Sequence, residues 1–423
     1  MLHDRLDRDY LYVANKEDGL TIWNIQNIEN PIMVDQITKT ELSNLDVMNL
    51  TQQGDYLYLA IGNTFNNSTD LSGMAIVNVS DPLNSFVEDI YTLPNSEGGS
   101  GIVEVEGDFA YLGAMENGLI ILDISIKSDI QFVSQIIPQI NWPDTNQDSL
   151  KVNARGLAVR NDIVYLCYDA GGFRIIDASQ KTNPVEIGRY SNPVMNGLPR
   201  AYNNITIDGN LAYLAVDYCG LEIVDFSNPS NIQLIGWWNP YNCPTNNWFT
   251  CPVHANEISL NKNCKQIFLS TGKSDMMVID VSNTSSPDSC NYFGGVSNNI
   301  GTWGLDVYEN KIFLSYVCTF GIPFASNWSG FKSITFNSCT LSNKELEIQN
   351  ENFGPNPVRN YFYFSNEIGS YNLCSYDGKI INKNQTKIDV FNKRIDFTNL
   401  KNGIYLLSYP SNNQLKTIRI IKE

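Results

Sequence analysis

Two acidic residues, Glu104 and Asp306, stand at corresponding positions of two alternating apolar segments. A pair of carboxylates at a suitable separation can hydrolyse a glycosidic bond. Other copies of this segment carry non-acidic residues at the position, namely Asn49, Ala158, Thr206 and Ser259. The pattern therefore requires no acid there, so we expect a solvated wall and predict no catalytic residue.

A second set of acids ends a series of short apolar segments: Asp123, Asp177, Asp225 and Asp280. Two further copies of the segment end in Asn24 and Asn78. A carboxylate needed for one reaction has no reason to recur in this way. The side-chain oxygen of either Asp or Asn can accept a hydrogen bond from the backbone of a following turn. We therefore predict that these residues fasten turns.

Signatures of metal and nucleophile chemistry are sparse. The chain has two histidines, and neither a His-Glu-x-x-His nor a Gly-x-Ser-x-Gly motif. We expect His254 to be a loop or capping residue, with ligand binding as the alternative. Asp144, Asn146 and Asp148 are spaced like the opening of a calcium loop, but the later glycine and acid are missing. A polar turn is the main expectation there, calcium is the alternative, and no other cofactor is predicted.

Nine cysteines without a Cys-x-x-Cys pair favour an oxidising compartment over a metal site. Cys243 and Cys251 flank a short stretch of a long loop and are the first candidates for a disulfide. Cys264 and Cys290 are the second candidates. Several other cysteines are expected to be buried thiols.

The elements that position these residues form a repeat. Each copy has a strand containing Tyr-Leu, a turn ending in Gly and an apolar strand closing on Asp or Asn. The Tyr-Leu strand of each copy carries one aromatic residue at a fixed position, and consecutive copies place it 45 to 55 residues apart. These residues are Tyr12, Tyr58, Tyr111, Tyr165, Tyr213, Phe268 and Phe313. With one alternating strand before and one after, each copy predicts four short antiparallel strands. No segment has a helical period, so the fold class is all-β, with copies that stack on one another.

The apolar strands LIILD at Leu119, FRIID at Phe173, LEIVD at Leu221 and MMVID at Met276 resemble the LVIVD repeat family. The resemblance covers residues 1–336 and implies a β-propeller. Seven copies imply seven blades. The first blade is expected to be truncated, because its first strand would begin at or before Met1.

After a polar stretch at 337–350, expected to be a linker or a last outer strand, the chain continues with alternating strands and Asn-Pro, Asp-Gly and Asn-Gly turns. This pattern predicts a small Ig-like antiparallel β-sandwich at 351–423. Its marker residues are Pro355, Asn356, Pro357, Gly378, Gly403, Tyr405 and Lys416. These residues resemble the C-terminal sorting domain of the type IX secretion system of Bacteroidota. The resemblance implies the secretion machinery as a partner and a secreted or surface-attached protein.

The composition is compatible with export. The formal charge of −17 disfavours nucleic acid and anionic membranes as partners. No apolar run approaches the length needed to span a bilayer, so no membrane span is predicted. A signal peptide is expected for export, and none follows Met1. We therefore expect the recorded start to lie inside the natural gene product.

Insertions indicate a recognition surface. In a four-stranded blade, the second-to-third and fourth-to-first connections share one face. Nearly every insertion falls there, namely at 61–72, 138–153, 192–202, 239–254 and 316–329. The ligand-binding candidates in or beside them are Trp142, Trp248, Trp328, Tyr241 and His254, because aromatic faces beside polar groups suit a sugar or an extended peptide. The strand-end residues Trp237, Trp238 and Trp303 are expected to seal adjacent blades.

The sequence therefore favours a secreted or cell-surface binding module without catalysis, which recognises glycan or protein through the loop-rich face. One alternative is a secreted hydrolase or lyase that uses channel carboxylates. Another is a structural surface-layer protein.

Overall fold

The computed structural model describes residues 1–65, 68–145, 152–251, 253–271, 275–293, 302–316, 330–336, 358–363, 371–375, 379–381, 388–389, 394–411 and 414–423. The chain divides into two compact units, Met1–Cys339 and Thr340–Glu423. Within the described ranges, no helix has both the length and the apolar character that a membrane span requires.

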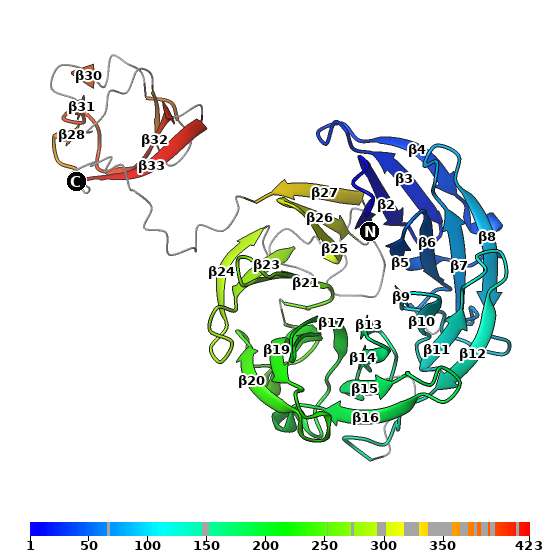
Figure 1. Cartoon of the computed structure of the whole chain (residues 1–423). Helices are drawn as coiled ribbons and strands as arrows, with labels where there is room; N and C mark the ends of the chain where they lie inside the picture. Colours follow the sequence, from blue (N-terminus) through cyan, green and yellow to red (C-terminus); the bar gives the residue numbers. More distant parts are fainter. Residues whose placement is uncertain are drawn as a thin grey trace. The chain divides into compact units, whose positions relative to one another are not determined.

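The first unit is a ring of antiparallel sheets, an arrangement typical of a β-propeller (Figure 1). Six sheets have four strands in sequence order, and a seventh has three among the described residues. The innermost strands are β1 (Leu2–His3), β5 (Val47–Gln53), β9 (Ile102–Glu106), β13 (Gly156–Arg160), β17 (Tyr202–Asp208), β21 (Ile258–Asn261) and β25 (Thr302–Tyr308). The second strands are β2 (Tyr10–Ala14), β6 (Tyr56–Ile61), β10 (Phe109–Gly113), β14 (Ile163–Cys167), β18 (Leu211–Val216), β22 (Gln266–Ser270) and β26 (Lys311–Tyr316).

The third strands are β3 (Leu20–Asn24), β7 (Gly73–Asn78), β11 (Leu119–Asp123), β15 (Phe173–Asp177), β19 (Gly220–Asp225), β23 (Met276–Asp280) and β27 (Gly330–Thr335). The outer strands are β4 (Ile32–Ile37), β8 (Phe86–Thr92), β12 (Gln131–Ile136), β16 (Val185–Tyr190), β20 (Gln233–Trp238) and β24 (Asp288–Phe293). Short 3-10 turns accompany them, namely η1 (Lys39–Leu42), η3 (Pro193–Met195), η4 (Asp217–Cys219), η5 (Pro229–Asn231) and η6 (Cys243–Thr245).

The repeated aromatic residue of the second strand is buried in every sheet, at 5% exposure or less. This aromatic residue pairs with the central residue of the third strand, as Tyr111 does with Ile121 and Tyr213 with Ile223. Because side chains alternate along a strand, this shared register turns the same apolar faces toward the neighbouring sheets. The repeat therefore builds the core between sheets, as predicted.

In the six four-stranded sheets, the Asp or Asn that ends the third strand fastens a turn, which confirms the prediction. The Asp177 Oδ1 accepts the Ser179 backbone N–H at 2.9 Å. Asn78, in the same position, accepts the Ser80 N–H at 3.0 Å. Asp and Asn serve equally because only a side-chain oxygen two residues before the donor is needed.

The ring closes where β1 and β25 lie side by side. The His3 ring stacks on the Tyr308 ring, with centroids 3.8 Å apart. Asp306 accepts the His3 backbone N–H at 2.7 Å and forms an ion pair with Arg5, also at 2.7 Å. Asp306 is thus a residue that joins the first sheet to the last.

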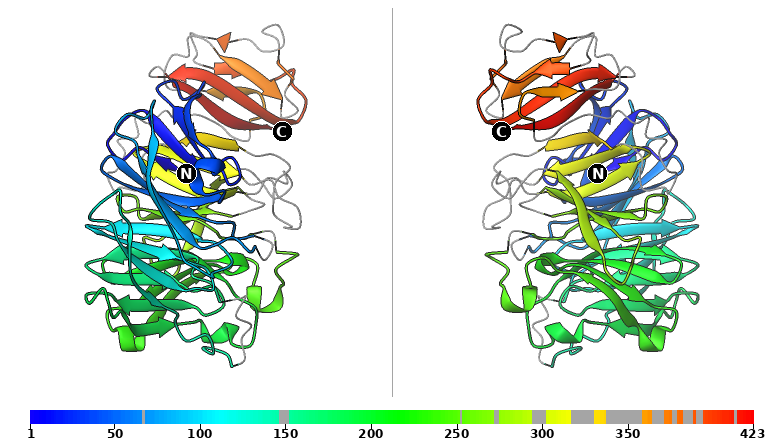
Figure 2. Two further views of the ribbon diagram at one scale, coloured as in Figure 1. Left: turned by 90° about the vertical axis from the view of Figure 1, so that its right-hand side faces the viewer. Right: turned by 90° about the vertical axis from the view of Figure 1, so that its left-hand side faces the viewer.

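The connections differ in length between the two faces of the ring. In the six four-stranded sheets, the third and outer strands are joined by seven residues each time. The longest described connections join outer strands to the next inner strand, as at 239–257. Figure 2 shows this segment, in green, projecting from one side of the ring.

The second unit contains two three-stranded antiparallel sheets, in the orders β28-β31-β30 and β29-β32-β33. Their strands are β28 (Tyr361–Tyr363), β29 (Asn372–Ser375), β30 (Ile388–Asp389), β31 (Arg394–Asp396), β32 (Gly403–Ser411) and β33 (Gln414–Lys422). Gly403 begins β32, and Lys416 pairs with Tyr409. The buried Tyr405 donates its hydroxyl to the Lys401 carbonyl at 2.7 Å. Pro355, Asn356, Pro357 and Gly378 lie outside the described residues.

Candidate functional site

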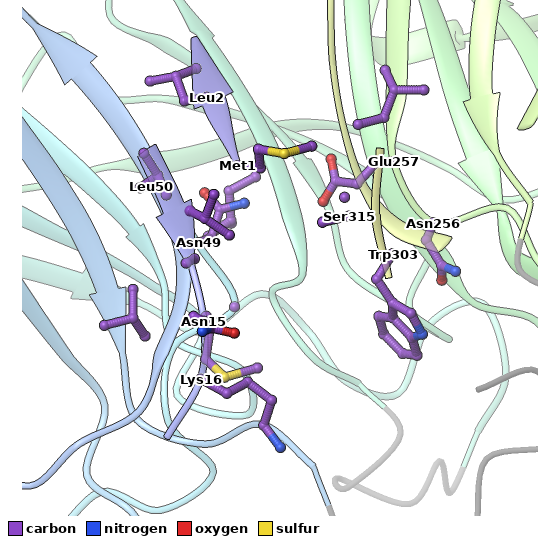
Figure 3. A pocket seen from close by; sticks show the side chains of 18 of the residues that line it. Met1, Leu2, Asn15, Lys16, Asn49, Leu50, Asn256, Glu257, Trp303 and Ser315 are labelled. Carbon is purple, nitrogen blue, oxygen red and sulfur yellow. The ribbon is translucent and has the colours of Figure 1, made fainter. Parts of the chain in front are cut away.

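The inner strands surround a cavity of about 430 Å³ (Figure 3). Part of its lining comes from connections that follow second strands, such as Lys16 after β2 and Phe65 after β6. The cavity therefore reaches the face that carries the long connections. Asn49 and Glu257 point into it from opposite sides, and the Trp303 indole lies at its wall (Figure 3).

Glu104 projects from β9 into this cavity, opposite Tyr111 in the strand register. Thr51 has the same register in β5, opposite Tyr58, so Thr51 rather than Asn49 is the counterpart of Glu104. The Thr51 hydroxyl donates to Glu104 Oε2 at 3.3 Å. Burial raises the pKa of Glu104 to about 7, although this hydrogen bond and the charge of Arg5 oppose the shift.

Glu257 is the second cavity carboxyl, and it was missed from the sequence. It immediately precedes β21, in which Ser259 faces Phe268. Side chains two residues apart in a strand share a face, so counting back from Ser259 gives the signal that would have identified it. The Asn204 amide donates to Glu257 Oε2.

Burial raises the pKa of Glu257 to about 7. The Met1 amino group, the Asn204 hydrogen bond and Arg155 oppose this shift, and the negative charge of Glu104 reinforces it. Glu104 and Glu257, in one cavity, therefore both gain or lose a proton near neutral pH.

Asp306 also lines the cavity, but it is only 7% exposed. Its two oxygens accept from the His3 N–H and from the Arg5 guanidinium. Asp306 is therefore held in an ion pair with Arg5. Glu104 and Glu257 also line the cavity, and neither has an ion-pair partner among the described residues.

The aromatic part of the lining differs from the prediction. Trp303, expected to seal two sheets, packs edge-to-face against Phe65 in the cavity wall, with ring centroids 4.9 Å apart. The Lys16 ammonium lies 5.1 Å from the centre of the Phe65 ring. Trp238 is buried and Trp237 donates to the Cys219 carbonyl at 3.0 Å, as sealing residues should.

The connection at 239–257 presents two exposed aromatic residues, Tyr241 at 41% and Phe249 at 67%. Trp248 is half-buried and donates its indole N–H to Asp217 Oδ2 at 3.0 Å. His254 is buried, with Nδ1 2.5 Å from Asp217 Oδ1 and Nε2 3.0 Å from the Cys251 carbonyl oxygen. His254 therefore helps to anchor the connection through these contacts, as expected of a loop or capping residue.

Trp142 is half-buried between two guanidinium groups, 4.8 Å from that of Arg174 and 5.0 Å from that of Arg189. It does not line the cavity that the inner strands surround, called the channel cavity below. Trp328 lies outside the described residues.

The disulfide prediction was wrong in its pairing. Cys243 is bonded to Cys219, whose Cα lies 5.1 Å away, within the range that a disulfide requires. The Cys251 Sγ is instead 3.6 Å from the Tyr218 carbonyl oxygen. Cys264 is disulfide-bonded, but not to Cys290, which has a free and exposed thiol.

The proposed calcium turn is described only at Asp144. Its carboxylate accepts from the Arg200 guanidinium at 2.5 Å and from the Gly197 N–H at 3.1 Å, so a protein cation already faces it. Asn146 and Asp148 are outside the described ranges. Across those ranges, no three acidic, His or Cys side chains are grouped to hold a metal ion.

Sequence comparisons identify both parts of the chain. The LVIVD repeat profile matches residues 6–38, 97–136, 153–192, 199–239 and 268–290. The profile of a secretion system C-terminal sorting domain matches residues 353–423. No curated protein matches the chain significantly.

Solved structures resemble the chain in fold alone. Sqt1 of Chaetomium thermophilum, bound to the N-terminus of the ribosomal protein L10, is 9% identical with a TM-score of 0.51. The alignment covers 72% of this chain and 78% of that one. U3-55K is 10% identical with a TM-score of 0.50, covering 78% of this chain and 92% of its own.

Proposed function

Because this LVIVD-repeat protein ends in a type IX sorting domain, and is thereby secreted or held at the outer surface, we propose that it is a non-catalytic binding module for a glycan or a protein. The observation that carries the proposal is the cavity of about 430 Å³ reaching the loop-rich face. Ligand sites commonly have this size and combine apolar walls with a few polar groups.

The surroundings of the cavity support the same function. Trp303 and Phe65 offer ring faces at its wall, and Tyr241 and Phe249 are exposed on a long connection. Aromatic rings beside amide and carboxyl groups suit stacking combined with hydrogen bonding. The roles of Trp142, Trp248 and Trp328 in binding remain part of the proposal.

We also infer that the seven sheets are the blades of one seven-bladed propeller at 1–336. Their shared strand register and the closure of the first sheet on the last support this count. We further propose a connecting segment at 337–350 and an Ig-like sandwich at 351–423. A core that combines Phe362 and Ile395 of one sheet with Leu407 and Ile420 of the other supports the sandwich. A source in Bacteroidota is part of the same proposal.

The test uses the full chain on a glycan array and in pull-downs from extracellular protein. Replacing Trp303 or Phe249 by Ala should weaken binding about tenfold or more, since aromatic residues that a ligand covers often carry most of the binding free energy. The same assay tests Trp142, Trp248 and Trp328. Ile126→Ala is the matched control, because Ile126 is exposed in a third-to-outer connection. Binding that none of the loop-face replacements alters would contradict the proposal.

One observation favours a second function. Glu104 and Glu257 line one cavity, and burial raises the pKa of each to about 7, so each can gain or lose a proton near neutral pH. Carboxyl groups of this kind suit general acid or base work on a glycan, in a hydrolase or a lyase. Turnover of a glycan that Glu104→Gln and Glu257→Gln each abolish would establish it. A chain with neither turnover nor ligand would be a structural surface-layer component.

A further inference from the structure

We propose that the channel cavity binds a protonated primary amine, presented as a lysine side chain on an extended protein segment. This proposal rests on the proposed binding function and names the ligand class of that site. It follows from the balance of hydrogen-bond donors, acceptors and charges in the wall.

Three asparagines of the wall, Asn203, Asn204 and Asn256, direct their amide donors at protein acceptors. The Asn203 amide donates to the Ala255 carbonyl at 2.8 Å, and the Asn204 amide donates to Glu257. The Asn256 amide donates to the His254 carbonyl at 3.1 Å.

The acceptors offered to the cavity are carboxyl oxygens. Glu104 and Glu257 both line it, and one oxygen of each accepts from a protein donor, Thr51 or Asn204. A ligand that complements this wall must bring donors, and an ammonium has three donors and no acceptor.

The charges favour a cation. Five acidic and two basic side chains line the cavity: Glu17, Asp18, Glu104, Glu257 and Asp306, with Lys16 and Arg155. Among the described residues, neither Glu104 nor Glu257 forms an ion pair, whereas Asp306 is held by Arg5. Arg155 itself is 3.9 Å from Asp169. The charge of the Met1 amino group offsets part of this negative charge, since it interacts with Glu257 and Asp306.

A lysine fits better than an amino sugar. The lysine ammonium, with a pKa of about 10.4, stays charged at neutral pH, whereas the amine of an amino sugar loses its proton near neutrality. The lysine stem can lie along Trp303 and Phe65 while its head reaches the carboxylates. The chain's own Lys16 already places an ammonium 5.1 Å from the Phe65 ring centre.

Fluorescence anisotropy with the full chain tests the proposal. The probes are labelled Gly-Gly-Lys-Gly-Gly and the same peptide with acetyl-lysine, which has no charge. A glucosamine trimer and an N-acetylglucosamine trimer serve as competitors. At pH 8 the lysine peptide should bind about tenfold tighter or more than its acetylated form.

The preference for lysine should shrink as the pH falls below 7, because the cavity carboxyls then take up protons while the ligand stays charged. Glu104→Gln and Glu257→Gln should each reduce it about fivefold or more, since each removes one charge. Glu309→Gln removes an exposed acid from an inner-to-second turn and should leave it unchanged.

Equal binding of the two peptides, or stronger competition by the glucosamine trimer than by unlabelled lysine peptide, would overturn the proposal. If a neutral glycan binds and Trp303→Ala weakens it, the binding function stands and the lysine inference fails. Absence of binding to every probe and to the glycan array would overturn both.

Discussion

In the six four-stranded sheets, the Asp or Asn that ends the third strand stabilises the fold through a local hydrogen bond. In Asp177→Ala the Ser179 N–H loses its acceptor, so we expect the free energy of unfolding to fall by about 1 kcal/mol. Asp177→Asn keeps an oxygen in place and should stay near the parent. Urea denaturation at pH 7 measures both. Equal losses in the two variants would show that the turn hydrogen bond is not the cause.

Glu257, when ionised, lowers the free energy of unfolding, because burial raises its pKa from 4.5 to about 7. The folded chain then binds the proton more tightly than the unfolded chain, so stability should fall as the pH rises from about 4.5 to about 7 and then level off. Glu257→Gln removes this fall and should be more stable than the parent at pH 8 by about 1 kcal/mol or more, since one pKa unit is worth about 1.4 kcal/mol.

Unfolding free energies of Glu257→Gln and the parent at pH 5 and pH 8 provide the measurement. The exposed Glu309→Gln is the matched control and should follow the parent. A parent whose stability rises between these two pH values while the variant does not would contradict the raised pKa.

Whether the role of a residue could be predicted from the sequence depended on how far along the chain its partner lies. The turn residues were predicted because donor and acceptor are two residues apart, as with Asp177 and Ser179. The structural role of Asp306 was not predicted, because its partner Arg5 is 301 residues away and approaches only when the ring closes. Glu257 was missed for a different reason. It lies just outside the strand, where alternation is easily overlooked.

The connection at 239–257 is tied to the ring at several points. The disulfide between Cys219 and Cys243 holds one part, and Asp217 holds another through Trp248 and His254. These ties restrain the backbone beside the exposed aromatic residues. A restrained connection loses less conformational entropy when it binds a ligand.

The disulfide closes a loop across a separation of 24 residues, and cross-linking such a loop is worth about 3 kcal/mol in the chain-entropy account. We expect the double variant Cys219→Ala/Cys243→Ala to lose about 2–4 kcal/mol of unfolding free energy and to be cleaved faster by protease within 239–257. Cys290→Ser, at an exposed free thiol, should change neither. Peptide mapping without reductant would refute the pairing if it recovered Cys243 linked to Cys251.

The pairing itself could not be predicted from spacing, because several partners were open to Cys243 in a chain of nine cysteines. The decisive fact is that η4 lies beside the start of η6, which follows from the packing of one sheet's connections. The strands were easier to predict from the sequence than the disulfide. Their repeated apolar pattern and turn residues predicted the sheet elements, since each copy can bury its apolar faces only against its neighbours.

At the scale of the whole molecule, the chain divides into two compact units, the ring and the tail. The ring closes through contacts at its own two ends, among them the His3 and Tyr308 rings and the Asp306 bonds. Such closure leaves no inner strand without a neighbour, so the inner surface is rigid enough to position the cavity groups. The tail forms its own core, with Phe362, Phe397 and Leu407 buried in it.

This separation predicts that the tail directs export independently of the ring. A signal peptide and a fluorescent reporter followed by residues 340–423 should reach the medium or outer surface of a type IX-competent cell. Ending the fusion at residue 402 is the control. It deletes β32 and β33, which supply Leu407 and Ile420 to the core, and should leave the reporter in the periplasm. Periplasmic retention of both fusions would mean that residues before 340 are required, whereas export of both would place the signal outside these two strands.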